Sequence, residues 1–340
     1  MSQTLVHTYP VDMPVQDYSE LNSDEYLLNL QSNVSPLVFK CPQGTEVKVT
    51  HDNLGQLSLF GEEDSPWSHL ALHAPGDETQ VVALYLHGKW WPVGDVLKTS
   101  DKSRSGLVVV ESVMERVVLF LLSQVIFGIQ ERPQEEHMYF SPHPIWEFCK
   151  ILWLDGEAVG FYSVKKKGSL CDGYTGQSYL LPVLDTMFVR THWRRKGLAL
   201  RMLEDFCTSL SEQALGISFP VSPSMYEVCR KYLEIHQEER DRLYEVEAPG
   251  DWSQRRNVWL SIQLQKGPTI TKTAQCPDTL SSHRRRELLS RGKTTDGKLE
   301  KKDSSTTVIR ASDLHRGAGE KRPADKAEGT VGSKQAKTIN

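Results

Sequence analysis

The sequence predicts an α+β domain over residues 80–265, and three observations favour this fold class. Two aromatic-rich runs flank an Asp-Gly pair, a pattern typical of an antiparallel hairpin. Apolar residues recur at helical spacing in three segments, which begin near residues 110, 198 and 224. Short runs rich in Val, Ile and Leu lie between these helices. Helices and strands are therefore mixed along the chain.

Residues 1–79 are predicted to form an N-terminal extension or a subdomain of unknown type. Short apolar runs alternate there with turn-forming stretches such as "FGEEDSPW" and "HAPGDE". The predicted domain then opens with a strand at 81–87, "VVALYLH", because Val and Tyr favour extended backbone.

A core helix is expected at residues 110–127. Apolar residues at 110, 113, 114, 117, 118, 121, 122, 125 and 126 share one face, and Gly128 is expected to end the helix. Ser123 and Gln124 interrupt the run, which is shorter than the roughly 20 apolar residues of a membrane-spanning helix. We therefore expect a buried helix and no membrane insertion.

The clearest local pattern is "WEFCKILWLDGEAVGFYSVKKKG". Asp155 and Gly156 tolerate the positive φ angles of a tight hairpin turn, so strands are predicted at about 146–154 and 158–165. A third strand, "SYLLPVLDTMFVR", is expected to end near Arg190.

The second half of the domain is predicted to alternate between helices and strands. An amphipathic helix is expected from Leu198, followed by a short strand in "ALGISFPVS". The next helix is expected to begin with a capping box formed by Ser224 and Glu227. Two final strands are predicted in "RLYEVE" and "NVWLSIQLQ".

The charge of the chain is unevenly distributed. The 340 residues carry a net charge of -4, but the last 60 hold 15 Lys and Arg against 8 Asp and Glu, a net charge of +7, so the rest carries -11. Residues 266–340 lack aromatic side chains, and we expect a disordered basic tail. Because the region before the tail is acidic, sequence-specific nucleic-acid binding is not expected.

Localisation is predicted from the two ends of the chain. "KRPADKAEGTVGSKQAK" is similar to a bipartite nuclear import signal, which favours the nucleus over the cytoplasm, although a solvated end without a signal has the same composition. The N-terminal "MSQTLVHTYPVDMP" lacks the pattern of a secretory signal. The six cysteines are scattered, without C-x-x-C or zinc-finger spacing, so neither disulfides nor a metal site are predicted.

The stretch "RRKGLA" has the composition of an anion site. Arg194, Arg195 and Lys196 precede Gly197, which is expected to open a helix after a strand. The first N–H groups of a helix have no partner within it and attract anions, and glycine lets a phosphate approach them. A charged surface turn or an import signal is the alternative interpretation.

The R-x-x-G-x-A spacing of Arg194, Gly197 and Ala199 resembles the acyl-CoA-binding motif of the GCN5-related N-acetyltransferase superfamily, Gln/Arg-x-x-Gly-x-Gly/Ala. The order of predicted elements from 80 to 265 is also similar. This resemblance implies a mixed, mainly antiparallel sheet flanked by helices, and acetyl-CoA as cosubstrate. The residues implied to contact acetyl-CoA are Met187, Phe188, Val189, Arg194, Arg195, Lys196, Gly197, Leu198 and Ala199.

A narrower resemblance comes from "DTMFVRTHWRRKGLALRMLEDFC" and "RLYEVEAPGDW". These runs are similar to the family with sequence similarity 169, which includes the soluble lamin-associated protein, and within it to the shorter member. This resemblance implies a nuclear context and a nuclear protein partner more than a particular reaction.

The superfamily resemblance also implies two catalytic residues. Asp185 is the only carboxylate in the motif strand and is the candidate base, although the histone-acetylating relatives place a Glu nearer to Val183. Tyr232 is the candidate acid, with Tyr226 as a fallback; a core tyrosine is the alternative interpretation of Tyr232. Two functions remain, an acetyl-CoA-dependent N-acyltransferase acting on a protein or small amine, and an inactive nuclear binding or scaffold protein with the same fold.

Overall fold

The computed structural model describes residues 8–13, 26–28, 30, 37–42, 44–60, 68–131, 141–171 and 176–265. The predicted tail at 266–340 lies outside these residues, as does most of the chain before residue 37. All described residues belong to a single unit that ends at Lys272.

The Asp155-Gly156 hairpin is present, as the sequence predicts. Both residues have positive φ, 50° at Asp155 and 76° at Gly156, which Asp and Gly tolerate in a tight turn. The turn joins β8 (Phe148–Leu154) to β9 (Glu157–Lys165), and β10 (Val183–Val189) pairs with the other edge of β9. These three strands form the centre of the main sheet.

The main sheet has seven strands in the order β13-β12-β11-β10-β9-β8-β7. The β10–β11 and β11–β12 pairs are parallel, and the other neighbouring pairs are antiparallel. The α+β class is therefore confirmed, with antiparallel pairs in the majority. The outer strands are β7 (Gly106–Val109), β11 (Leu215–Ser218), β12 (Leu243–Val246) and β13 (Arg255–Asn257).

A second, four-stranded antiparallel sheet precedes the main sheet in sequence. The strand predicted at 81–87 belongs to β5 of this second sheet, and the predicted domain boundary between residues 79 and 80 falls inside β5. Its strands are β3 (Leu54–Ser58), β4 (Ser68–Ala74), β5 (Asp77–Leu86) and β6 (Lys89–Pro92). Three short elements accompany it, β1 (Val38–Lys40), β2 (Glu46–Lys48) and α2 (Val93–Val96).

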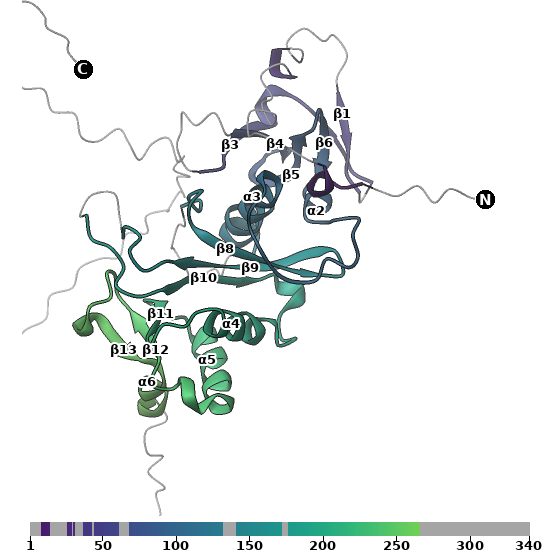
Figure 1. Ribbon diagram of the computed structural model, residues 1–340. Coiled ribbons are helices and arrows are strands. Elements are labelled where there is room, and N and C mark those ends of the chain that lie inside the picture. Colours follow the sequence, from purple (N-terminus) through teal and green to yellow (C-terminus); the bar gives the residue numbers. More distant parts are fainter. Residues whose placement is uncertain are drawn as a thin grey trace, which may run out of the picture. The chain divides into compact units, whose positions relative to one another are not determined.

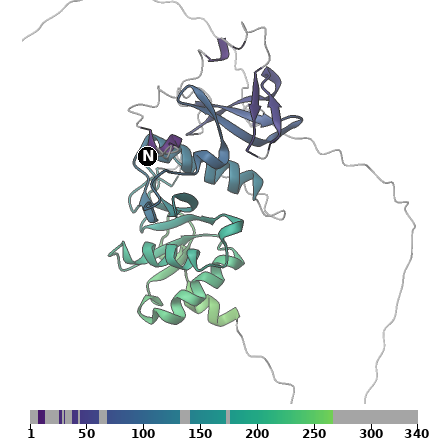
Figure 2. The same cartoon turned by 90° about the vertical axis from the view of Figure 1, so that its right-hand side faces the viewer.

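Helices cover both faces of the main sheet (Figure 1). On one face, α3 (Val113–Phe120) and the π-helix η4 (Leu121–Gln130) pack against Trp153 and Phe161. On the other face, α4 (Leu198–Thr208), α5 (Pro223–Ile235) and α6 (Val258–Gln265) pack against Leu152 and Tyr162. Neighbouring residues of one strand thus face different cores, as the alternation of strand side chains requires. The turned view in Figure 2 shows the same layers.

The first predicted helix has different ends from those expected. It begins at Val113, because Ser112 and Glu115 form a capping box, and not at residue 110. It continues through Gly128 as η4, so the prediction that Gly128 ends the helix is wrong. Among the described helices, Val113–Gln130 is the one with the length and hydropathy, 1.6, of a membrane span, and 67% of it is buried within the structure. Burial of this helix in the core agrees with the expected core helix.

Two further predictions of local structure are wrong. Helix α5 begins at Pro223 with Ser222 as its cap, whose Oγ accepts the N–H of Met225 at 3.2 Å, so Ser224 and Glu227 do not form a capping box. In the run "NVWLSIQLQ", Asn257 ends β13 and the remaining residues form the helix α6 and not a strand. The Asn257 side chain accepts the N–H of Leu260 at 2.9 Å and so starts that helix.

Candidate functional site

The candidate site begins where the parallel strands β10 and β11 separate. Only the first two residues of β10 pair with β11, and a bulge at Asp185 follows. Over 186–189, β10 pairs with β9 alone, so within the described residues its other edge has no strand partner. Such an edge can bind an extended ligand through its N–H and C=O groups. The predicted contact residues Met187, Phe188 and Val189 lie on this edge.

The chain then enters α4 through a backbone that leaves amides unpaired. Gly197 has φ 79° and ψ 1°, a left-handed conformation that glycine adopts readily, and no side chain caps the helix. The N–H groups of Gly197, Leu198 and Ala199 have no acceptor among the residues that the structure describes. A Cβ at position 197 would meet no atom within 4 Å, so the space beside Gly197 is open.

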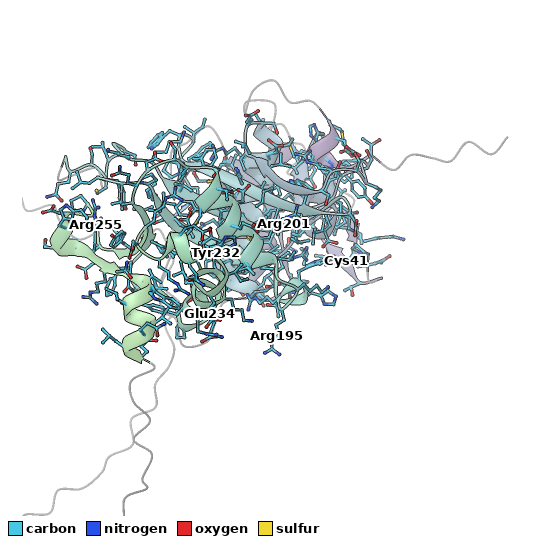
Figure 3. All side chains as sticks on the ribbon, turned by 60° about the horizontal axis from the view of Figure 1, so that its bottom comes forward. Cys41, Arg195, Arg201, Tyr232, Glu234 and Arg255 are labelled. Carbon is cyan, nitrogen blue, oxygen red and sulfur yellow. The ribbon has the colours of Figure 1, made fainter. Side chains whose placement is uncertain are left out.

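The three cations of the motif differ in their contacts. Arg194 turns back onto the loop, where its Nε donates to the carbonyl of Val189 at 2.8 Å. Arg195 is exposed, and Figure 3 shows its side chain projecting from the surface. The Nζ of Lys196 lies 4.4 Å from the centroid of the Trp193 ring, and Lys196 is also exposed. Arg194 therefore holds the loop, whereas Arg195 and Lys196 are accessible to an anion.

Glu131, at the end of η4, fixes the start of the same loop. Its Oε2 accepts the N–H of Thr191 at 2.6 Å and the Oγ1 hydroxyl of Thr191 at 2.7 Å. The Arg194 guanidinium lies 3.7 Å from the same oxygen. The helix on one face of the sheet thereby positions the loop that precedes α4.

The predicted base, Asp185, lies at the bulge where the open edge of β10 begins. It is half-buried, and its Oδ1 accepts the hydroxyl of Ser218 at 3.2 Å. The Nζ of Lys165 lies 3.9 Å from Oδ2. The structure thus brings Asp185 close to the predicted cofactor edge and gives it a cationic neighbour that the sequence does not indicate.

Lys165 links Asp185 to a more deeply buried acid, Glu147. The Nζ of Lys165 lies 2.6 Å from Glu147 Oε2, and His143 Nδ1 lies 3.1 Å from Oε1. Burial alone would raise the pKa of Glu147, but its bonds to His143 and Lys165 outweigh burial and lower the pKa to about 2. Glu147 in turn raises the pKa of Lys165, against the effect of burial. Lys165 is therefore a fixed cation beside Asp185.

The two candidate tyrosines lie in different surroundings. Tyr232 is 1% exposed in the core between the sheet and α4. Burial raises its pKa, and so does a hydrogen bond with Cys207. Tyr226 is half-buried in the first turns of α5, and its hydroxyl donates to Glu245 Oε2 at 2.8 Å. The environment of Tyr232 is that of a core tyrosine, and the roles of both residues stay predictions.

Comparison with known proteins shows which family the chain belongs to. The chain is 45% identical over 265 residues to Protein FAM169B of Mus musculus, a match that covers 76% of this chain and 78% of that protein. It is 46% identical over 157 residues to Protein FAM169BP of Homo sapiens, which covers 43% of this chain and 80% of that protein. The chain belongs to the FAM169B family. Neither known family descriptions nor solved structures give a match.

Membership in the FAM169B family confirms the narrower resemblance of the sequence. The names of these FAM169B relatives state neither a ligand nor a reaction, so the chemistry depends on the site itself. Sequence reasoning missed Glu131, Glu147 and Lys165. One of them carried a signal, because Glu147 interrupts the aromatic and apolar run "WEFCKILWL" and a buried carboxylate requires a partner.

Proposed function

We propose that the chain is an acetyl-CoA-dependent N-acyltransferase that acts on an amine of a protein or a small molecule. One observation carries the proposal, the uncapped α4 N-terminus at Gly197 directly after the unpaired edge of β10. The two features together match the two parts of the cosubstrate, a diphosphate and an amide-bearing arm. A GCN5-related N-acetyltransferase fold is part of the same proposal.

The diphosphate of acetyl-CoA would bind at the Gly197 junction. Its oxygens would accept hydrogen bonds from the N–H groups of Gly197, Leu198 and Ala199, where the helix dipole also favours negative charge. Arg195 and Lys196 would add charge-assisted contacts from the exposed side. The pantetheine arm would then extend along the edge of β10 that has no strand partner, before the Val189 carbonyl, which Arg194 occupies.

In the transfer step, the acceptor amine attacks the thioester carbonyl, the new C–N bond forms and the C–S bond breaks. The amine must lose protons, and the candidate base is Asp185, which lies at the bulge where the edge that would hold the pantetheine arm begins. The departing thiolate takes one proton, for which Tyr232 and Tyr226 are the candidate donors. A covalent intermediate on the protein is not needed.

Calorimetric titration with acetyl-CoA tests the proposal. The wild-type chain should bind, and Gly197→Glu should weaken binding at least about 100-fold, because it places a side chain and a negative charge where the diphosphate would lie. Gly76→Glu is the matched control, since Gly76 also has positive φ, 77°, and open space around its Cβ position. Equal binding by wild type and Gly197→Glu, or no binding by the wild type, would refute the proposal.

A second candidate function is a nuclear binding protein that retains the cosubstrate site without turnover. The contacts of the predicted catalytic groups favour it, because Asp185 is bound by Ser218 beside Lys165 and Tyr232 is buried in the core. Transfer of labelled acetyl groups to a peptide library separates the two functions, since binding without transfer favours the second.

A further inference from the structure

A cluster of three metal-ligating side chains lies on the α3 face of the main sheet, apart from the open edge of β10. His143, Glu147 and Cys149 are all nearly inaccessible, with Glu147 5% and Cys149 1% exposed. One ligand atom of each side chain lies within 4.8 Å of the corresponding atoms of the other two. All three come from residues 143–149, a short stretch that ends with Cys149 in β8.

A buried hydroxyl without a partner adjoins this cluster. Ser163 is fully buried, and its Oγ makes no hydrogen bond in the described part of the chain. Cys149 and Ser163 are directly opposite each other on β8 and β9, so their side chains emerge on the same face with Cβ atoms about 5 Å apart. A buried hydroxyl that forms no hydrogen bond destabilises the folded chain. Ser163 is therefore expected to have a partner that the described residues do not supply.

We propose that His143, Glu147 and Cys149 bind a zinc ion. The hydroxyl of Ser163 would either be the fourth ligand or form a hydrogen bond to one of these three. Imidazole nitrogen, thiolate sulfur and carboxylate oxygen are the donors that zinc prefers. On binding, the Cys149 thiol gives up its proton to solvent and the sulfur bonds to the metal, while His143 binds as neutral imidazole. The charges of zinc, thiolate and carboxylate then cancel, which suits a buried position.

The geometry needs only a small contraction. In tetrahedral zinc sites, with bonds of about 2.0 to 2.3 Å, neighbouring ligand atoms lie about 3.3 to 3.8 Å apart. His143 Nδ1 and Glu147 Oε1 are already 3.1 Å apart, so the ion would replace the proton that they now share. The sulfur of Cys149 would move toward this pair by about 1 Å from the 4.8 Å limit of the cluster.

Neighbouring cations are arranged to support this site. Lys165 binds the Oε2 oxygen of Glu147 and leaves Oε1 toward His143, and its charge is balanced by Asp185 at 3.9 Å. The guanidinium of Arg116 donates to the main-chain carbonyls of Ile145 and Glu147 at 2.8 and 3.1 Å. Both contacts hold the ligand segment in place, as outer partners of metal ligands commonly do. The zinc would be structural, tying the segment before β8 to the sheet.

Metal content of the purified full chain tests the inference. After incubation with zinc and gel filtration, the wild type should retain about one zinc ion per chain by mass spectrometry. Cys149→Ser and His143→Gln should each lose it. Cys207→Ser is the matched control, because Cys207 is equally buried but belongs to the core on the other face of the sheet, so this variant should keep the metal.

The wild type alone also decides the question if the ligand variants do not fold. With cobalt in place of zinc, a sulfur-to-cobalt charge-transfer absorption should appear, and a chelator should abolish it and lower the melting temperature. The inference is overturned if the wild type retains no metal, if bound cobalt shows no sulfur ligation, or if Cys149→Ser and His143→Gln retain as much zinc as Cys207→Ser. None of these readouts depends on acetyl-CoA, so the inference stands or falls apart from the proposed transferase function.

Discussion

Two of the strand-to-helix junctions of the main sheet, β10–α4 and β11–α5, follow neighbouring parallel strands but differ in how their backbone amides are satisfied. β10 leads into α4 at Gly197, and the parallel strand β11 leads into α5 at Ser222. At the second junction, Ser222 Oγ accepts the N–H of Met225 at 3.2 Å and Glu245 Oε1 accepts the N–H of Val221 at 3.0 Å. At the first junction, no side chain caps the helix.

This difference shows that an uncapped helix start is not a necessity of the fold. A serine at the helix start and an acid on a neighbouring strand satisfy the backbone at the β11–α5 junction. The β10–α4 junction has a left-handed glycine and exposed cations instead, although Glu131 and Arg194 fix its loop. The chain therefore holds this loop in place while its amides remain available, as a preorganised anion site requires.

The largest expected effect concerns the capped junction. Glu245→Ala should lower the free energy of unfolding by about 3 kcal/mol, because it leaves the N–H of Val221 and the hydroxyl of Tyr226 without their acceptor. Urea denaturation measures this loss. Acetyl-CoA affinity, measured in the folded protein, should stay unchanged. A loss of affinity as large as that of Gly197→Glu would show that the two junctions are not independent.

A smaller effect is expected from the exposed cations of the uncapped junction. The double variant Arg195→Gln, Lys196→Gln should weaken acetyl-CoA binding about tenfold at low ionic strength and less at high salt, because exposed charges are screened. Titration calorimetry at two salt concentrations measures both values. Stability should hardly change, since neither side chain forms an ion pair among the described residues. A salt-independent loss would instead indicate a distorted loop.

Much of the fold could be predicted because its strongest patterns are local. Asp155 and Gly156 identify the central hairpin, and the helical spacing from Leu198 identifies α4. Where the prediction is wrong, the structure depends on a side-chain hydrogen bond that no sequence pattern reveals. Asn257 starts a helix in a run that reads as a strand, and Ser222 rather than Ser224 caps α5.

The candidate site was predicted in part for the same reason. The motif at Gly197 is a continuous stretch of sequence, so its position after a strand could be inferred. Its supporting residues come from distant elements, as Glu131 lies 60 residues before Thr191 and Lys165 reaches Glu147 across 18 residues. Such pairs depend on strand register, which a single sequence does not reveal. The cluster of His143, Glu147 and Cys149 was not predicted from the sequence, because the spacing of these residues matches no zinc-finger pattern.

The smallest effect tests the capped junction by titration. Burial raises the pKa of Tyr226 to about 12, and so does its bond to Glu245, whereas an unfolded tyrosine has a pKa of about 10. The folded chain therefore holds this proton more tightly, so the contribution of Tyr226 to stability is complete below pH 10 and is lost as the pH rises through 12. Tyr226→Phe should be less stable than the wild type at pH 9, and the gap should shrink at pH 11. The other tyrosines are present in both the wild type and the Tyr226→Phe variant. Their contributions therefore cancel in the difference between the two urea midpoints. A gap that stays constant with pH would mean that the hydroxyl of Tyr226 does not stabilise this junction through Glu245.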